Sequence, residues 1–204
     1  MTLSKLNLEI TGKQMAESKP TGMHDTESGA VMLTPSQRSA AVARLVENEP
    51  QATDIAVLSS LTQHGICLRD KGDWRFPTDA DPYFVDRGFE IIFSKKISPD
   101  VNAAIQTVTM SMSAMPIADM EKSLLTTMML MVKPSGESSQ DAAMRCKLYA
   151  NQMRDWPADI FVKVLDTIAK KQTFWPAFAE FNKHYERLIR TRKNMLETLQ
   201  KCTK

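Results

Sequence analysis

The sequence has no long uninterrupted apolar segment and no glycine-rich phosphate loop. Its nearest approach to a membrane span, Met110–Val132, is broken by Pro116, Asp119, Glu121 and Lys122, whereas a span needs about 20 mostly apolar residues. Neither a Walker A motif nor a G-x-G-x-x-G motif is present, so the common nucleotide-binding loops are excluded. We therefore expect a soluble chain without membrane contact and without a bound cofactor.

Cysteine is scarce and unpaired. The three cysteines, Cys67, Cys146 and Cys202, lie far apart and form no C-x-x-C pair, which argues against a zinc or thioredoxin-like site. An odd number of cysteines and the absence of a secretory signal peptide are typical of a reducing compartment. These features predict a cytoplasmic protein.

Histidine is also scarce, and none of the three is set in a motif for nucleophilic catalysis. His24 falls in a polar N-terminal segment, His64 lies three residues before Cys67, and His184 lies between Lys183 and a tyrosine. A metal site at His64 would need two further ligands, and none is spaced nearby. We therefore predict no metal and no catalytic residue, and a protein that is not an enzyme.

Three aspartates leave an enzymatic alternative open. Asp79, Asp81 and Asp86 fall in a segment rich in aromatics, prolines and glycines. They lack the glycine and the glutamate of a calcium-binding loop, so solvated loop carboxylates are the simpler interpretation. A divalent-metal-dependent activity would be needed to support the alternative.

Aromatic residues make up only 7% of the chain, but there are 14 methionines. Methionine fills irregular cores and also forms adaptable binding surfaces. Charge is uneven as well: Met144–Lys204 holds 13 of the 26 Lys and Arg but 6 of the 24 Asp and Glu, a net +7 against −5 for the remainder. A basic C-terminal region predicts contact with nucleic acid or with an acidic protein.

Three regions follow from the order of polar, aromatic and periodic segments. Residues 1–33 are polar and predict a disordered tail; residues 34–99 predict short helices and an aromatic loop region, in which Phe89–Lys96 is either a strand or a helix end. Residues 100–204 predict a helical bundle of about four helices that ends in a long basic helix. The predicted fold class is all-α.

Helix starts and apolar stripes locate the helices within this plan. Thr34 and Asp100 are placed to cap helices, as is Ser138 or the serine after it. In the helix expected over Gln140–Arg154, the inner face is assigned to Met144, Leu148 and Met153. The last helix is expected to begin at Trp175-Pro176 and to carry a heptad-like seam in which Arg192 fills one slot, with Phe174, Phe178 and Phe181 stapling its entry to the core.

The basic half of the last helix is the candidate binding surface. The candidate nucleic-acid-binding residues are Lys183, Arg187, Arg190, Arg192 and Lys193. Lys183, Arg187 and Arg190 are three or four residues apart and share a helix face, so they form a row able to contact phosphates. A solubilising helix face is the competing interpretation. Trp74, Phe76 and Tyr83 either stack on exposed bases or pin a loop to the core.

The C-terminal third carries a family resemblance. A helix with R-x-K-x-Y-A, a turn at W-P-A-D and a helix opened by F-W-P-x-[FW]-x-E-[FL] resemble small phage and prophage proteins of the replication module. They resemble more loosely the helical domain of replicative-helicase loaders and inhibitors. Tyr149, Phe174, Pro176, Phe178 and Glu180 occupy the matching positions. The resemblance covers Glu121–Leu199 and implies a helical fold, a helicase partner and the cytoplasm of a bacterial host cell as the compartment. The flexible segment follows the domain in that family, whereas it precedes the domain here.

These observations predict a non-enzymatic accessory protein of phage or bacterial DNA replication. Its expected partners are a replicative helicase or another replisome protein, and single- or double-stranded DNA. Two other functions stay open: a DNA-binding transcriptional regulator, and a structural or assembly protein that uses Arg190–Lys204 as a coiled-coil arm.

Overall fold

The fold is that of a computed structural model, which describes residues 34–132 and 136–203. The chain divides into two units, Met1–Ala30 and Val31–Lys204, and all the described residues belong to the second. The tail predicted over residues 1–33 lies outside the described residues. The described part is mostly helical but contains a β-hairpin, so the predicted all-α class is correct only in its helical majority.

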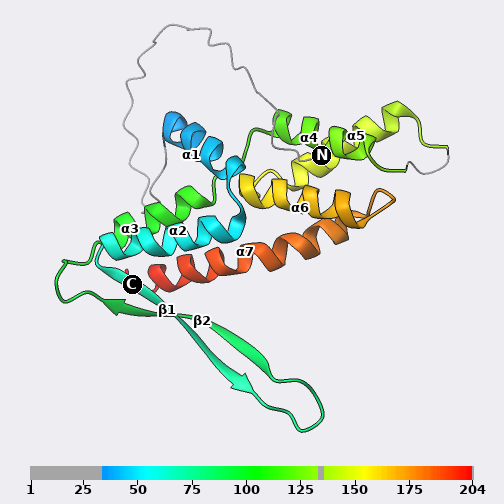
Figure 1. The fold of residues 1–204 in the computed structure, drawn as a ribbon. Helices are drawn as coiled ribbons and strands as arrows, with labels where there is room; N and C mark the ends of the chain where they lie inside the picture. Colours follow the sequence, from blue (N-terminus) through cyan, green and yellow to red (C-terminus); the bar gives the residue numbers. More distant parts are fainter. Residues whose placement is uncertain (1–33, 133–135, 204) are drawn as a thin grey trace, which may run out of the picture. The chain divides into compact units, whose positions relative to one another are not determined.

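Seven helices and two strands follow one another along the described residues (Figure 1). In chain order these are α1 (Pro35–Glu47), α2 (Pro50–Gln63), β1 (Ile66–Arg75), β2 (Tyr83–Phe93), α3 (Val101–Ser111), α4 (Ile117–Met129), α5 (Ser139–Gln152), α6 (Ala158–Lys171) and α7 (Phe178–Gln200).

The predicted helix caps are present. Thr34 and Gln37 form a capping box at α1, and Ser138 forms one with Asp141 at α5. The Asp100 carboxylate accepts a hydrogen bond of 2.9 Å from the backbone N–H of Ala103 at α3. Each cap satisfies backbone donors that the first turn of a helix leaves without partners. These helices therefore begin where the sequence predicts.

The hairpin replaces the loop expected over much of residues 65–99. Strands β1 and β2 pair antiparallel, with Ile66 opposite Phe93 and Arg75 opposite Tyr83. A bulge interrupts the register between Asp70 and Gly72. Only Ile66 and Leu68 of β1 are buried, so the alternation that predicts a strand ends after four residues. This explains why the sequence left Phe89–Lys96 open between a strand and a helix end, and why it did not indicate the partner strand.

Gly65 forms the joint between α2 and the hairpin. Its φ of +72° favours glycine, and a Cβ placed there would lie 2.9 Å from the carbonyl oxygen of Ile97. The Gly65 carbonyl also accepts a hydrogen bond from the N–H of Ser94, and the carbonyl of His64 accepts one from Asp100. The hairpin is thus tied at its base to the end of α2 and the start of α3.

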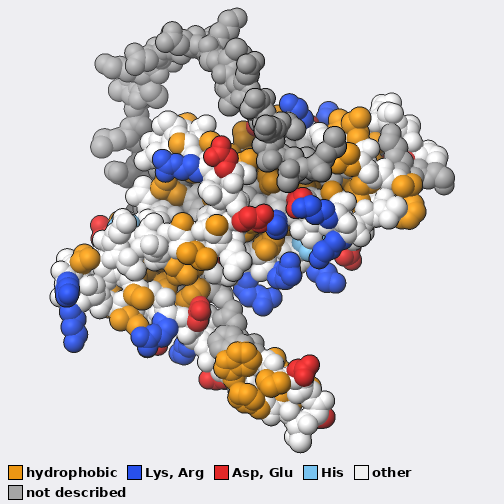
Figure 2. Space-filling view, viewed as in Figure 1, with side chains coloured by type: hydrophobic (Ala, Val, Ile, Leu, Met, Phe, Trp, Pro, Cys, Tyr) orange, Lys and Arg blue, Asp and Glu red, His pale blue; other side chains and the backbone are white. Residues whose placement is uncertain are grey.

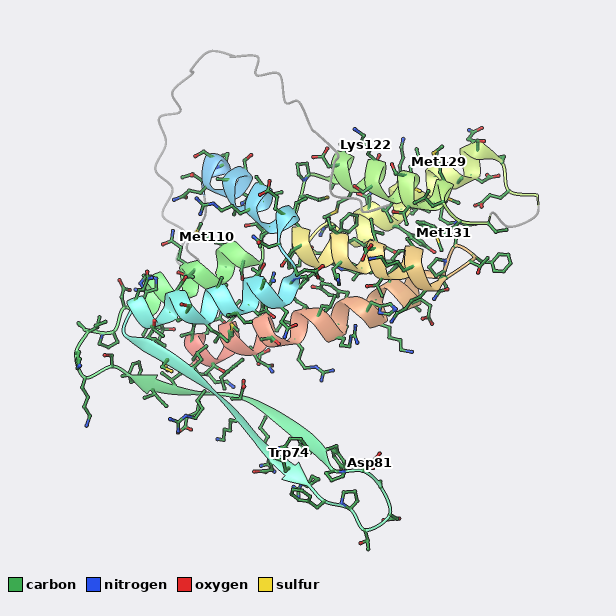
Figure 3. The ribbon with its side chains drawn as sticks, in the orientation of Figure 1. Trp74, Asp81, Met110, Lys122, Met129 and Met131 are labelled. Atoms are coloured by element: carbon green, nitrogen blue, oxygen red, sulfur yellow. The ribbon has the colours of Figure 1, made fainter. Side chains whose placement is uncertain are left out.

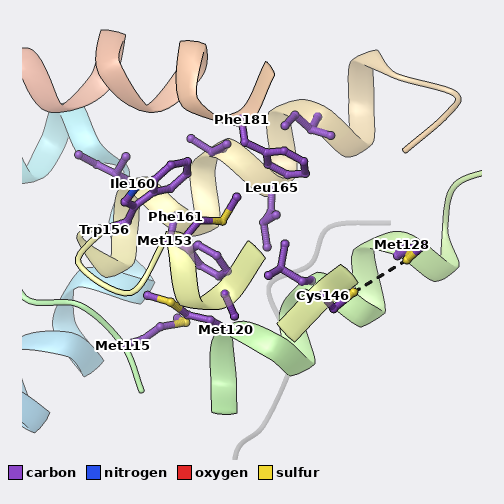
Figure 4. Close-up of a cluster of buried hydrophobic side chains, with 14 of the residues drawn as sticks. Met115, Met120, Met128, Cys146, Met153, Trp156, Ile160, Phe161, Leu165 and Phe181 are labelled. Carbon is purple, nitrogen blue, oxygen red and sulfur yellow. Dashed lines mark hydrogen bonds between the residues drawn. The ribbon is translucent and has the colours of Figure 1, made fainter. Parts of the chain in front are cut away.

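Two buried clusters hold the elements together, and α7 contributes to both. The first combines α1, α4, α5, α6 and the first half of α7 (Figure 4). The second combines Val57 and Leu61 of α2, the start of β1, α3, and Met195 and Leu199 of α7. Because residues on both sides of the predicted boundary at 99–100 share the second cluster, 34–99 and 100–204 pack as one unit.

Aromatic side chains make up one end of the first cluster. The Trp156 ring stacks on Tyr185 with centroids 4.2 Å apart, and Tyr149 contacts Trp175, Phe178 and Phe181. Tyr149 and Phe178 therefore serve mainly to pack the entry of α7. Phe174 is an exception to the predicted staple, because its side chain is exposed and the buried Trp175 takes that place.

The inner face predicted for α5 is wrong in two of its three residues. Met144 and Leu148 are exposed, while the small side chains Ala142, Cys146 and Ala150 are buried. Small residues allow α5 to approach α4 closely, and the Cys146 Sγ lies 3.9 Å from the Met128 Sδ. The large apolar side chains of α5 are consequently left on the surface.

Candidate nucleic-acid interface

The basic residues predicted on α7 separate into three environments. Lys183, Arg187 and Arg190 are exposed. We call these three residues the basic row. No ion pair to any of them is found in residues 34–132 and 136–203. In the space-filling view, Lys and Arg side chains gather along α7 (Figure 2). The basic row is therefore available to an external anion.

Lys193 is only partly available. Its Nζ lies 3.3 Å from a Glu186 carboxylate oxygen and 5.4 Å from the centroid of the Tyr185 ring. These contacts hold the side chain along its own helix and neutralise part of its charge. Lys193 flanks the basic row and is a weaker candidate for phosphate contact than the sequence indicated.

Arg192 does not belong to the interface, and its assignment as a nucleic-acid-binding residue is corrected. Its side chain is 0% exposed, and Asp159 beside it is 1% exposed. The guanidinium donates two hydrogen bonds to the Asp159 carboxylate, one of 2.6 Å to Asp54, and others to the carbonyls of Ser111 and Pro50. A buried charge keeps such partners because exposing or unpairing it is costly.

Arg192 thereby joins four parts of the chain at one point. Asp54 comes from α2, Asp159 from the first turn of α6, and the Ser111 carbonyl from the end of α3. The predicted heptad-like seam placed Arg192 among buried positions, and this position predicted its structural role better than its charge did. The heptad pattern of α7 was the signal that identifies it as structural.

The positive charges near the basic row act on the pKa of His184. The pKa of His184 is lowered, first by partial burial and then by the positive charges of Arg187, Lys171 and Lys183, while Glu180 acts in the opposite direction. Lys171, at the end of α6, therefore adds to the charge of the row from a second helix. The first turns of α7 present a local positive potential despite the chain's net charge of only +2.

The second half of α7 packs on the body of the fold. Met195 and Leu199 are fully buried against α2, α3 and β1. The alternative in which Arg190–Lys204 projects as a coiled-coil arm is therefore contradicted. The basic row therefore lies on a helix that is held at both ends by buried clusters.

The candidate sites of other chemistry remain scattered. Asp79 and Asp81 are exposed in the connection between the strands, and the side chain of Asp86 lies outside the described part. The His64 Nε2 lies 3.2 Å from the Thr107 hydroxyl, and Cys67 is exposed on β1. In the part of the chain that the structure describes, no three His, Cys, Asp or Glu residues are grouped as metal ligands.

A second surface feature is an apolar area on α4 and α5. Hydrophobic side chains gather over these helices in Figure 2, and Met129 is labelled on α4 in Figure 3. We call this set the Met-Leu face; its exposed members are Leu125, Met129, Leu130, Met144 and Leu148. A continuous exposed apolar patch marks a contact surface, and these five side chains are exposed on two helices that pack on one another.

A groove is also present beside α1. It has a volume of about 760 Å³ and runs between α1, the α3–α4 connection and Arg154-Asp155. The buried Ser113 hydroxyl in its lining has no hydrogen-bond partner in the structure. Met112, Met115 and Ile117 make much of its wall apolar. The groove brings together no set of catalytic side chains.

Comparison of the chain with protein-family models, curated proteins and solved structures found no match. A separate search found that none of the described helices is both long enough and apolar enough to cross a membrane. The functional argument therefore depends on the exposed charges and apolar side chains themselves.

Proposed function

We propose that this chain is a non-enzymatic accessory protein of phage or bacterial DNA replication. In this proposal the basic row of α7 holds DNA, and the Met-Leu face binds a replicative helicase or another replisome protein. The observation that carries the proposal is the basic row: Lys183, Arg187 and Arg190 are exposed on one face of α7. The resemblance to replication-module proteins supplies the setting.

The spacing of the basic row suits a run of phosphates. Seven residues separate Lys183 from Arg190, which corresponds to about 10 Å along a helix. Arginine and lysine side chains reach several ångströms beyond the helix surface, so the three cations can each contact a phosphate of one strand. A contact of this kind releases counterions, and three contacts predict a salt slope of about −2 to −3 in log affinity against log salt.

The test of DNA binding is a salt series with fluorescent single- and double-stranded oligonucleotides. The binding variant combines Lys183→Ala, Arg187→Ala and Arg190→Ala. The matched control combines Arg44→Ala, Lys122→Ala and Lys147→Ala, which removes the same charge from exposed positions on other helices.

We expect the binding variant to lose at least tenfold in affinity at low salt and to show a salt slope near zero. The control should bind as the wild type does. Equal losses in both variants would mean that total charge alone matters, and no binding by the wild type would reject the proposed DNA contact. A strong preference for one duplex sequence would favour a transcriptional regulator instead.

The Met-Leu face supports the protein-partner half of the proposal. Leu125 and Met129 are one turn apart on α4, and Met144 and Leu148 are one turn apart on α5. Both pairs are exposed although their helices bury other apolar residues. Methionine side chains adapt to the shape of a partner, and the buried core of a protein interface is enriched in methionine.

The partner test is binding of a purified bacterial replicative helicase to immobilised protein. The variant Met129→Glu with Met144→Glu places two charges in the Met-Leu face and should reduce binding at least tenfold. The control Ile55→Glu alters an exposed apolar residue on α2 and should leave binding unchanged. Binding that is equal in all three proteins would reject the Met-Leu face as the contact, and no binding by any of them would reject the helicase as partner.

A further inference from the structure

The far half of the β-hairpin carries three exposed aromatic side chains. Trp74 is 60% exposed, Phe76 is 75% exposed and Tyr83 is 55% exposed. We call these three residues the aromatic tip. The Trp74 and Phe76 rings lie 6.4 Å apart between centroids, and Tyr83 pairs with Arg75 across the strands. Trp74 and the nearby Asp81 are labelled at this end of the hairpin in Figure 3.

The exposed surface of the aromatic tip is not explained by packing against the helices. The hairpin beyond the bulge extends away from the helices in Figure 1, and the residues at its far end, 73–76 and 78–83, are exposed. Large aromatic side chains contribute to stability by being buried, and here they are presented to solvent on a short scaffold. Of the two sequence interpretations, loop anchors or a stacking surface, the exposure favours the stacking surface.

The aromatic tip and the basic row lie on either side of the place where β2 packs against α7. The hairpin packs against α7, and a Cβ built on Gly88 of β2 would lie 4.0 Å from the Cγ of Asn194. Arg190 is one helical turn, about 6 Å, from Asn194. Trp74 pairs across the hairpin with a residue of β2 that lies four positions from Gly88. Four positions correspond to about 13 Å along a strand. A strand of a few nucleotides is long enough to reach both features.

We propose that the hairpin and α7 together bind single-stranded nucleic acid, with phosphates on the basic row and unpaired bases stacked on the aromatic tip. This inference rests on the proposed DNA contact of α7 and specifies its substrate. Ring faces stack on any base, whereas the bases of a duplex are stacked on one another and offer none. Proteins that bind single strands with little sequence preference combine a cationic groove with aromatic side chains in the same way.

Two carboxylates define which part of the strand lies at the tip. Asp79 and Asp81 are exposed in the connection beyond the aromatic tip and repel phosphates. Asp73 is paired with Arg87 at 2.7 Å and adds little net charge. Together with the exposed Arg75 these groups leave a net negative charge at the tip, which disfavours phosphates there relative to the basic row.

The experiment combines two readouts in one titration of the full chain with a labelled dT oligonucleotide. Label anisotropy reports binding anywhere, and tryptophan emission reports the aromatic tip. Trp74 is the one exposed tryptophan of the three in the chain, because Trp156 is 5% exposed and Trp175 is 7% exposed. Stacking of a base on Trp74 quenches its emission.

We expect quenching with dT but none with a duplex of equal length. The variant Trp74→Phe should lose the quenching and keep the binding. The variant Trp74→Ala with Phe76→Ala should lose at least tenfold in affinity for dT and little for the duplex. An rU oligonucleotide in place of dT distinguishes RNA from DNA as the ligand.

Removal of the two carboxylates gives a test of opposite sign. Asp79→Asn with Asp81→Asn should strengthen dT binding severalfold at low salt, because less negative charge faces the strand. Weaker binding or no change would show that the tip does not lie beside nucleic acid.

The outcomes separate this inference from the proposed function. If anisotropy rises while Trp74 emission and the affinity of the alanine variant stay unchanged, the DNA contact of α7 stands and the role of the hairpin is rejected. If no oligonucleotide binds at low salt, the proposed DNA contact fails and this inference fails with it. Quenching by a purified helicase, without quenching by dT, would assign the tip to a protein partner.

Discussion

Arg190 and Arg192 lie two residues apart on α7 and have opposite roles. Arg190 is exposed in the basic row, whereas Arg192 is fully buried between two carboxylates. Their charge is the same, and so is their helix. The difference comes from a rotation of about 200° around the helix axis, which places one side chain over solvent and the other in the core. Charge in a sequence therefore identifies a binding residue only after its helix face is known.

The largest effect should follow from removing the buried arginine. Arg192→Ala leaves Asp159 buried without its cation and should lower the free energy of unfolding by about 3–5 kcal/mol. Arg190→Ala should change it by no more than about 0.5 kcal/mol. Denaturant unfolding of the two variants measures the contrast directly. A cost below about 1 kcal/mol for Arg192→Ala would show that the buried pair is not a stabilising contact.

A triple change sharpens this result. Arg192→Met with Asp159→Asn and Asp54→Asn removes the charges together and should recover much of the stability lost in Arg192→Ala, because no unpaired ion is left behind. If the triple variant is as unstable as Arg192→Ala, the loss comes from packing of the long side chain and not from charge.

The basic row should show the reverse behaviour. The combination of Lys183→Ala, Arg187→Ala and Arg190→Ala should leave thermal unfolding within a few degrees of the wild type, while the oligonucleotide affinity falls at least tenfold. Unfolding scans on the same protein preparations used for anisotropy provide the comparison. A large loss of stability in this variant would mean that the row also supports the fold.

A smaller effect is expected at His184, whose pKa lies below the ordinary value of 6.5. Arg187→Ala should raise this pKa by removing a nearby positive charge, and bound oligonucleotide should raise it by adding negative charge. Lys201→Ala, at the other end of α7, should leave it unchanged. NMR titration of the His184 ring protons measures this pKa in the two variants and in the oligonucleotide complex. A pKa that does not respond to oligonucleotide would place the ligand elsewhere.

The smallest effect concerns Asp54, the second carboxylate on Arg192. Burial raises its pKa above 3.8, although the charge of Arg192 opposes the rise. The folded state then binds a proton more readily than the unfolded state, so stability falls as pH rises from 3.8 through the raised pKa. Asp54→Asn should remove this fall in chemical unfolding measured across that range.

Asp141 separates this effect from ordinary acid denaturation. Its pKa is lowered by hydrogen bonds from Ser138, so its contribution is present above 3.8 and is lost as pH falls below that value. The two carboxylates therefore act on opposite sides of pH 3.8. An unchanged slope above 3.8 in the Asp54→Asn protein would contradict the assignment to Asp54.

The starts of α1, α3 and α5 could be predicted from the sequence because helix-capping signals are local. Capping residues such as Thr34, Asp100 and Ser138 fix helix starts, and prolines mark the boundaries between helices. The inner face of α5 was missed because large side chains were assumed to be buried, whereas close packing against α4 selects alanines and Cys146. That choice depends on the neighbouring helix, which the sequence of α5 does not contain.

The candidate site was predicted in part for a similar reason. The exposed row followed from spacing alone, since Lys183, Arg187 and Arg190 share one face in any helix. The sequence near Arg192 could not show that this residue is buried and outside the site. Its partners Asp54 and Asp159 lie 138 and 33 residues away along the chain. The aromatic tip required the hairpin, whose far half has no core to impose an alternating pattern.

The shared helix α7 has a consequence for how the molecule opens. Because its first half completes one buried cluster and its second half completes the other, neither cluster can lose α7 without exposing apolar surface in both. The two clusters are therefore coupled, and residues 34–203 should unfold cooperatively in one transition. Amide protons in α6 and in α3, which lie in different clusters, should exchange with solvent through the same global opening.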